Sequence, residues 1–224
     1  MEISQQVNKG NTARSLYGLR MSIYVVFNDN IYDIVKNYST IPLEISKYFD
    51  KETGIYFTKI NDLSDVEIKN FNEYNNLINL SLQRRKVLET SLKINDFKKK
   101  SNLIISFIIA KKEVSTENNS VTMEKSINIS QIDFVELTSS DYGLDMLTVD
   151  KNDNFLKSTA SNFRSLRNNL ECLLLNRKPK HDTNLTLSLK RTLNSRSQVL
   201  FISCVHSNEE PPLESIKALK VKIF

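Results

Sequence analysis

Residues 103–110 read LIISFIIA, a nearly unbroken apolar run. A run of this length is typical of a β-strand that is buried on both faces of a sheet. Two further segments have a similar character, residues 127–137 (INISQIDFVEL) and residues 199–205 (VLFISCV). Together the three segments predict the central strands of one buried sheet.

Helical periodicity lies between and beyond these runs. It is clearest after residue 157, where an apolar stripe at helical spacing is formed by Phe163, Leu166, Leu170, Leu173 and Leu174. Residues 64–91 predict another helix, with Ser64 and Glu67 as a capping box. Two more are predicted around Leu185, Leu189 and Leu193 and around Leu213, Ile216 and Leu219. Strands separated by helices predict an α/β fold, with a mixed, mostly parallel sheet and helices on both faces.

The remaining segments carry weaker signals. Residues 21–35 predict a strand that breaks at residues 28–30 and runs into a short helical start, and residues 41–60 predict short strands around a turn at residues 51–54. The polar stretches 111–126 and 138–154 predict loops. Residues 1–20 predict a flexible lead-in, so one folded domain is expected over residues 21–224.

Composition excludes several classes of protein. The chain has 224 residues, 40% hydrophobic and 25% charged, which is ordinary for a globular domain. No apolar run approaches the roughly 18 residues that a membrane span needs, and the first ten residues lack the apolar stretch of a signal peptide. Cys172 and Cys204 predict buried thiols in a reducing compartment, and His181 and His206 lie at no metal-ligand spacing.

The positive charge is concentrated in the last third of the chain. Lys and Arg outnumber Asp and Glu by 12 to 5 in residues 155–224, whereas residues 1–154 carry 19 against 21. Such a surface fits nucleic acid, an anionic membrane or an acidic protein polymer, or else it is a solvated face that serves solubility. The lysine cluster at residues 98–100 has no interleaved aromatic side chains for base stacking, which argues against nucleic acid.

Five phrases, in order, resemble the kinesin motor domain. Residues 27–33 (FNDNIYD) are similar to the family's strand-ending phrase, and residues 132–134 (IDF) stand where switch II opens. Residues 164–166 (RSL), the stretch from Asn184 through residues 197–202, and the tail LESIKALK at residues 213–220 match later family phrases. The resemblance implies a kinesin-motor-like fold, related to P-loop NTPases, whose N-terminal part is missing.

The resemblance also implies that the nucleotide site is degenerate. A phosphate-binding loop needs the arrangement G-x-x-x-x-G-K-[ST], and the four glycines, at positions 10, 18, 54 and 143, do not provide it. At the switch I positions Lys98 and Lys99 replace serines, Lys100 replaces an arginine, Ser101 is kept and Asn102 replaces a histidine.

In switch II, Asp133 is kept, Glu136 replaces the phosphate-sensing glycine, and Thr138 replaces the glutamate of an ion pair. A carboxylate aimed at a phosphate is repulsive. We therefore expect no catalysis and no bound cofactor.

A kinesin fold without a nucleotide site resembles the non-catalytic accessory subunits of yeasts. These pair through a coiled coil with a catalytic minus-end-directed kinesin, on spindle microtubules and in nuclear fusion. The resemblance thus implies microtubules and such a kinesin as partners, neither nucleic acid nor membrane, and a location at the cytoplasmic cytoskeleton, the spindle and its poles or the nucleus. The alternatives are a scaffold that never contacts microtubules and an active ATPase whose phosphate loop lies on a preceding segment.

The same resemblance assigns a microtubule contact to the helix after switch II and the loop that follows it. An ordinary solvated helix face is the alternative. The residues expected to make the contact are Lys157, Arg164, Arg167, Arg177, Lys178 and Lys180, with Lys190 and Arg191 in second place.

Overall fold

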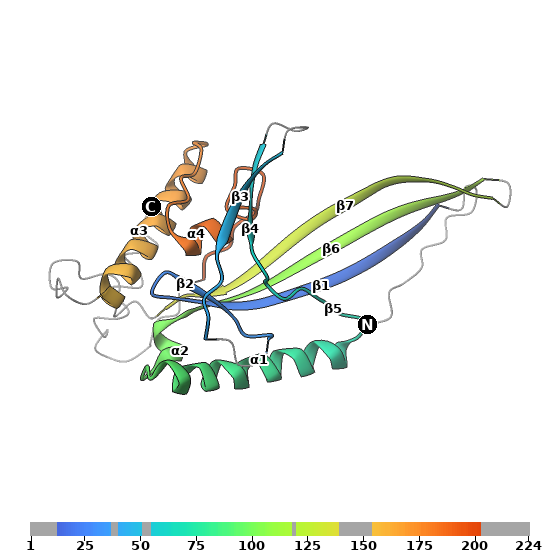
Figure 1. The fold of residues 1–224 in the computed structure, drawn as a ribbon. Coiled ribbons are helices and arrows are strands. Elements are labelled where there is room, and N and C mark those ends of the chain that lie inside the picture. Colours follow the sequence, from blue (N-terminus) through green and yellow to red (C-terminus); the bar gives the residue numbers. More distant parts are fainter. Residues whose placement is uncertain (1–12, 37–39, 51–54, 118–119, 139–153, 203–224) are drawn as a thin grey trace, which may run out of the picture.

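The computed structural model describes residues 13–36, 40–50, 55–117, 120–138 and 154–202. Three long strands form the frame of the fold: β1 (Ala13–Phe27), β6 (Asn102–Glu117) and β7 (Ser120–Glu136). The sheet order is β2-β1-β6-β7, with β2 (Asn30–Asp33) on one side, and the two-residue strand β5 (Val66–Glu67) also pairs with β1. Figure 1 shows the long strands extending as a twisted ribbon beyond the helices.

All pairings in the described sheet are antiparallel, so the predicted mostly parallel arrangement is wrong. Apolar runs do not specify the direction of a strand. They also overestimate burial here: the central strand predicted at residues 127–137 falls mainly within β7, the last strand of the described sheet, where Ile129 and Phe134 are 66% and 59% exposed. Only residues 118 and 119 separate β6 from β7, and a parallel pair would need a crossover of a dozen or more residues. The polar stretch at residues 111–126, predicted as a loop, contributes instead to both strands.

Two helical layers cover the sheet. On one face α1 (Phe71–Leu92) and α2 (Phe97–Lys100) close a core that contains Met21, Ile23 and Val25. On the other face α3 (Asn154–Leu174) and α4 (Asn184–Ser188) pack on a core with Tyr24 and Ile104. Alternate residues of β1 therefore serve the two cores, as the period of a strand requires. Figure 1 shows α1 and α3 on opposite sides of the sheet.

A small hairpin, β3 (Ile45–Asp50) and β4 (Ile55–Ile60), forms a second sheet. It confirms the short strands predicted within residues 41–60, and their predicted turn lies outside the described residues. The hairpin lies against α4, where the Thr58 hydroxyl is 3.5 Å from the Leu187 carbonyl oxygen.

Several predicted boundaries are shifted. Residues 13–20 are part of β1 and not of a flexible lead-in, and the predicted helical start near residue 31 is the strand β2. The turn between them is confirmed: Asn28 and Asp29, with φ of 49° and 57°, connect the strands as a two-residue hairpin turn. The predicted helical start fails because residues 30–33 pair with β1, and the predicted lead-in fails because residues 13–20 pair with β6.

The helix predicted from residue 64 begins seven residues later. Asn70 is its N-cap, accepting a bond from the Glu73 N–H at 2.9 Å, so the Ser64–Glu67 capping box is wrong. Glu67 belongs to β5, and because β5 pairs with β1, residues 66–67 are a strand and not the predicted helix start.

Two predictions concern the last part of the chain. Residues 199–202, predicted as part of a buried strand, lie outside all strands, and Leu200 is 84% exposed. The predicted last helix around Leu213, Ile216 and Leu219, together with Cys204 and His206, lies outside the described residues.

Candidate functional site

The long helix α3 is amphipathic, as the sequence predicts. Leu166 is buried, and Leu170 and Leu173 pack against the same core as Leu185. Phe163 is partly buried, whereas Leu174, at the end of the predicted stripe, is 68% exposed. The stripe therefore fixes which side of α3 faces the sheet, and its other side faces solvent.

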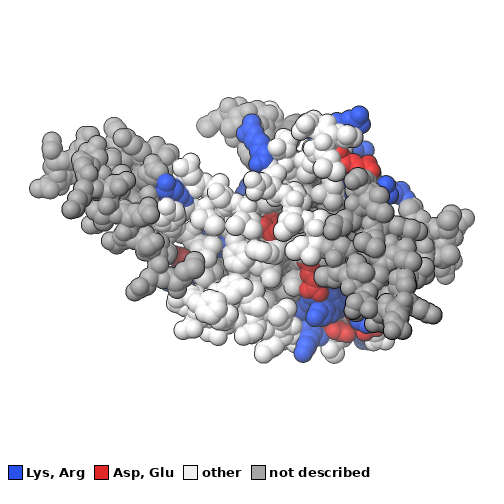
Figure 2. Space-filling model, turned by 180° about the vertical axis from the view of Figure 1, so that it is seen from behind, with Lys and Arg blue, Asp and Glu red and all other residues white. Residues whose placement is uncertain are grey.

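The solvent side of α3 and the segment after it carry the predicted contact residues. These residues, here called the basic face, are all exposed except the half-buried Lys190: Lys157, Arg164, Arg167, Arg177, Lys178, Lys180, Lys190 and Arg191. Arg167 also pairs with Glu171, one turn along the helix, at 3.5 Å. Figure 2 shows the molecule from behind. On the side seen there, Lys and Arg side chains lie largely around the outline, and the middle of the view is mostly uncharged.

The inner side of α3 is unusually polar. Besides Leu166 and Ala160, its buried residues are Thr159, Asn162, Ser165 and Asn169. The fully buried Asn169 donates from Nδ2 to the carbonyl oxygens of Ser165, at 2.8 Å, and Lys180, at 3.1 Å. The bond between Asn169 and the Lys180 backbone fixes the loop at residues 175–183, here called the basic loop, relative to α3.

A second group of polar contacts joins α3 to the start of α4. The Ser165 hydroxyl donates to the Asp182 carboxylate and lies 3.0 Å from the Thr186 hydroxyl. Thr183 and Thr186 form the capping box of α4. The sequence carries a signal for this interface, because Asn162, Ser165 and Asn169 recur at the helical spacing i, i+3, i+7 on the buried side.

The predicted switch I positions lie at the junction of α2 and β6. Lys98 and Lys99 are exposed, and Lys100 extends over the Phe155 ring, with Nζ 5.9 Å from its centroid. Ser101 is fully buried and donates to the Phe97 carbonyl oxygen at 2.7 Å. Asn102 accepts from the backbone N–H of Thr138 at 2.9 Å, which fixes the junction to the end of β7.

Glu136 makes an ion pair that the sequence did not predict. Its carboxylate lies 3.2 Å from Nη1 of Arg85, a residue of α1 whose side chain is only 4% exposed. Nη2 of Arg85 also donates to the carbonyl oxygens of Lys98 and Ser101, at 2.9 and 3.0 Å. Burial lowers the pKa of Arg85, and the charge of Glu136 opposes that shift. From the sequence alone, the run Arg84-Arg85-Lys86 would be expected on the solvated face of a helix, so the burial of Arg85 is not apparent.

Asp133 lies on the opposite face of β7 from Glu136, because the two positions differ by an odd number of residues. It accepts a bond from the Thr192 hydroxyl at 2.5 Å and two from Gln131, at 3.0 and 3.2 Å. Its carboxylate therefore connects the sheet to the turn after α4. The kept Asp133 and the substituted Glu136 therefore do not point toward a common ligand.

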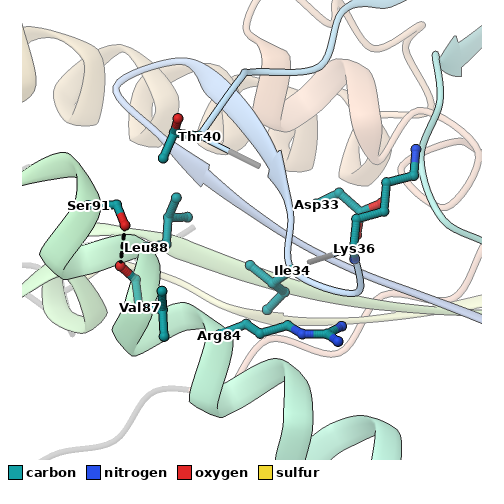
Figure 3. Close-up of a pocket in the computed structure, with 8 residues that line it drawn as sticks. All are labelled: Asp33, Ile34, Lys36, Thr40, Arg84, Val87, Leu88 and Ser91. Carbon is teal, nitrogen blue, oxygen red and sulfur yellow. Dashed lines mark hydrogen bonds between the residues drawn. The ribbon is translucent and has the colours of Figure 1, made fainter. Parts of the chain in front are cut away.

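Besides an open hollow of about 530 Å³ at the end of α1, the described part of the chain contains smaller cavities. One lies between α1 and the chain after β2, where Asp33, Ile34 and Leu88 are among the residues that line it (Figure 3). Its volume of about 20 Å³ is close to that of one water molecule. The Asp33 carboxylate is already used by the backbone N–H groups of Val35 and Ser64, both at 2.7 Å. A nucleotide does not fit there.

Comparison with known proteins decides the family. A family model described as the kinesin motor domain matches residues 1–221. The chain belongs to the kinesin motor domain family. Among solved structures, a chain named "kinesin 6" matches with a TM-score of 0.61 and 18% identity, over 80% of this chain and 48% of that one. This kinesin-family chain thus spans about half of the length of that structure. A search of curated proteins finds no match to this chain.

In this kinesin-family chain four of the predicted switch positions are engaged in internal bonds. Ser101, Asn102, Glu136 and Thr138 all have partners within the junction of α1, α2 and β7. No group of three or more His, Cys, Asp or Glu side chains within the described residues could hold a metal ion. None of the helices in the described ranges is long and apolar enough to cross a bilayer.

His181 gives the basic loop a pH-dependent component. Burial lowers the pKa of its ring below the ordinary value of 6.5, and the charge of Lys190 lowers it further. The unfolded chain then binds a proton at a higher pH than the folded chain, so the free energy of unfolding should fall as the pH drops below about 6.5. Thermal unfolding from pH 8 to pH 5 should show a larger loss for the wild type than for His181→Gln. Parallel curves would contradict the assignment.

Proposed function

We propose that this chain is a non-catalytic kinesin-like subunit that binds microtubules through the basic face. It would act with a catalytic minus-end-directed kinesin as a heterodimer, in the spindle or in nuclear fusion, and reside with the cytoskeleton, at the spindle, its poles or in the nucleus. Kinesin motor domains generally bind microtubules, which supports the first part. The observation that carries the proposal is the basic face on α3, a helix whose inner side is held by buried polar bonds.

The non-catalytic part of the proposal is supported by the occupied switch positions. An active site needs a carboxylate and hydroxyls that are available to magnesium and water. Here Asp133 bonds to Thr192, and Ser101 bonds to Phe97 and Arg85. Glu136 is engaged by Arg85 at 3.2 Å and lies on the opposite face of β7 from Asp133, so the two carboxylates cannot serve one nucleotide site.

The electrostatic character of the basic face predicts how binding responds to salt. Exposed cations that contact an acidic polymer make many weak interactions, which salt screens over a Debye length of about 8 Å at physiological ionic strength. The purified chain should co-sediment with microtubules, and binding should weaken steadily as salt is raised. Addition of ATP or ADP should leave the affinity unchanged.

Three outcomes separate the candidate functions. Salt-sensitive binding that ignores nucleotide supports the proposal. A folded chain that fails to sediment at low salt contradicts it and favours a scaffold that holds a partner kinesin. Binding that changes with ATP, together with phosphate release above a no-protein blank, contradicts the non-catalytic part and favours an active ATPase.

A further inference from the structure

Arg85 is the centre of a buried connection between three elements of the fold. It starts on α1, donates to Lys98 and Ser101 at the end of α2, and pairs with Glu136 at the end of β7. Only 3% of the residue is exposed, and Nε has no hydrogen-bond partner among the described residues. A buried guanidinium in this position is strongly destabilised if its counter-charge is removed.

One route from this connection reaches the first turn of α3 through aromatic rings. Phe97, in α2, is fully buried and lies 5.2 Å from the ring of Phe27 at the end of β1. Phe27 in turn stacks on Phe155 of α3, with centroids 5.6 Å apart. Lys100 lies over the same Phe155 ring. The position of α2 is therefore transmitted to α3 by direct packing.

A second route reaches the middle of α3 from the other end of the ion pair. Glu136 is two residues before Thr138, whose N–H and hydroxyl bond to Asn102 and to the carbonyl oxygen of Lys100. Leu137 and Thr138 line the same closely packed space as Asn162 and Leu166 of α3. Both routes end on the inner side of the helix that carries the basic face.

We propose that the Arg85–Glu136 ion pair holds α3, and with it the basic face, in one fixed position without a nucleotide. The inference rests on the proposed function, since it concerns the regulation of the same face. Arg85 and Glu136 are positioning residues: they would set microtubule affinity from the far side of the sheet and touch no microtubule themselves. The chain would then stay permanently in a single binding state.

The test uses a mild change and a matched control. Glu136→Gln keeps the shape and removes the charge, so it leaves Arg85 buried without its counter-charge. Asp65→Asn removes one charge from the exposed Arg20–Asp65 pair, at 2.7 Å, which joins β1 to the residue before β5 and shares no ion pair or hydrogen bond with Arg85. The readouts are hydrogen exchange of the α3 amides in the free chain and microtubule affinity by co-sedimentation. A double-mutant cycle with Arg85→Met measures whether the two residues act together.

Glu136→Gln should speed exchange of the α2 and α3 amides by about tenfold and weaken microtubule binding several-fold, whereas Asp65→Asn should do neither. Adding Arg85→Met to Glu136→Gln should cost less than the sum of the two single effects. Unchanged exchange in α3 would overturn the inference, even if Arg85→Met alone fails to fold. Faster exchange with unchanged affinity would overturn the link to binding. A wild-type chain that does not bind microtubules overturns the proposed function alone, because the exchange measurement still decides the connection.

Discussion

Phe97→Ala is expected to lower the free energy of unfolding by about 3–5 kcal/mol, the usual cost of removing a buried phenyl ring. Phe97 has no exposed surface, and it is in contact with the core that α1 closes on the sheet. It also packs against Phe27, so the cavity would open where α2 meets the end of β1. Because domains are stabilised by only about 5–15 kcal/mol, this is a large share of the total. Equilibrium unfolding in urea, followed by circular dichroism, measures the change.

Two variants control for the loss of an aromatic ring as such. Phe97→Leu should cost less than half as much, since leucine fills most of the space. Phe71→Ala removes a ring from the first turn of α1 that is 62% exposed, and it should change stability by no more than about 0.5 kcal/mol. A similar small loss for Phe97→Ala and Phe71→Ala would contradict the placement of Phe97 in the core.

Reversing three charges on the basic face is expected to have the largest effect on binding. The triple variant Arg164→Glu, Arg167→Glu and Lys178→Glu changes exposed side chains on the solvent side of α3 and the loop after it. At roughly 1 kcal/mol for each exposed charge contact, affinity for microtubules should fall by about 100-fold. Co-sedimentation at low salt measures the loss, and thermal unfolding shows whether the fold is intact.

The control variant has the same change in net charge on the other side of the sheet. Lys69→Glu, Lys86→Glu and Lys93→Glu alter exposed lysines within or next to α1, which covers the face opposite α3. This variant should keep its affinity within about threefold, since charges beyond a Debye length are largely screened. Equal losses in both variants would indicate binding through net charge alone and would contradict the basic face as the contact.

The sequence predicts the helices better than it predicts the sheet or the burial of its strands, since Ile129 and Phe134 of the predicted central strand are 66% and 59% exposed. The amphipathic pattern of α3 places Leu166 inside and Arg164 outside, because a helix is decided by residues close in sequence. The direction of β6 against β1 depends on segments about 80 residues apart, which no local pattern encodes. Residues 111–117 and 120–126 are polar yet form strands, since backbone bonding to neighbouring strands does not require apolar side chains.

The candidate site was predictable only on its outer side. Exposed cations such as Arg164 and Lys178 follow directly from the helical pattern and the charge distribution. Arg85 was not predictable, because an arginine on a helix is usually solvated and its burial depends on Glu136, 51 residues later. Likewise, the bond from Thr192 to Asp133 joins two segments whose neighbourhood is set only by the finished fold.

The polar inner side of α3 has a mechanical consequence. The bond from Asn169 to the Lys180 carbonyl oxygen and the contact between the Ser165 and Thr186 hydroxyls both leave α3, so they are satisfied at a single angle of the helix about its axis. A small rotation would leave amide and hydroxyl groups unpaired in a dry interior, at a cost of about 1–3 kcal/mol each. The rotation of α3 about its own axis is thus fixed. Its outward charges can be exchanged for others without changing the direction in which they point.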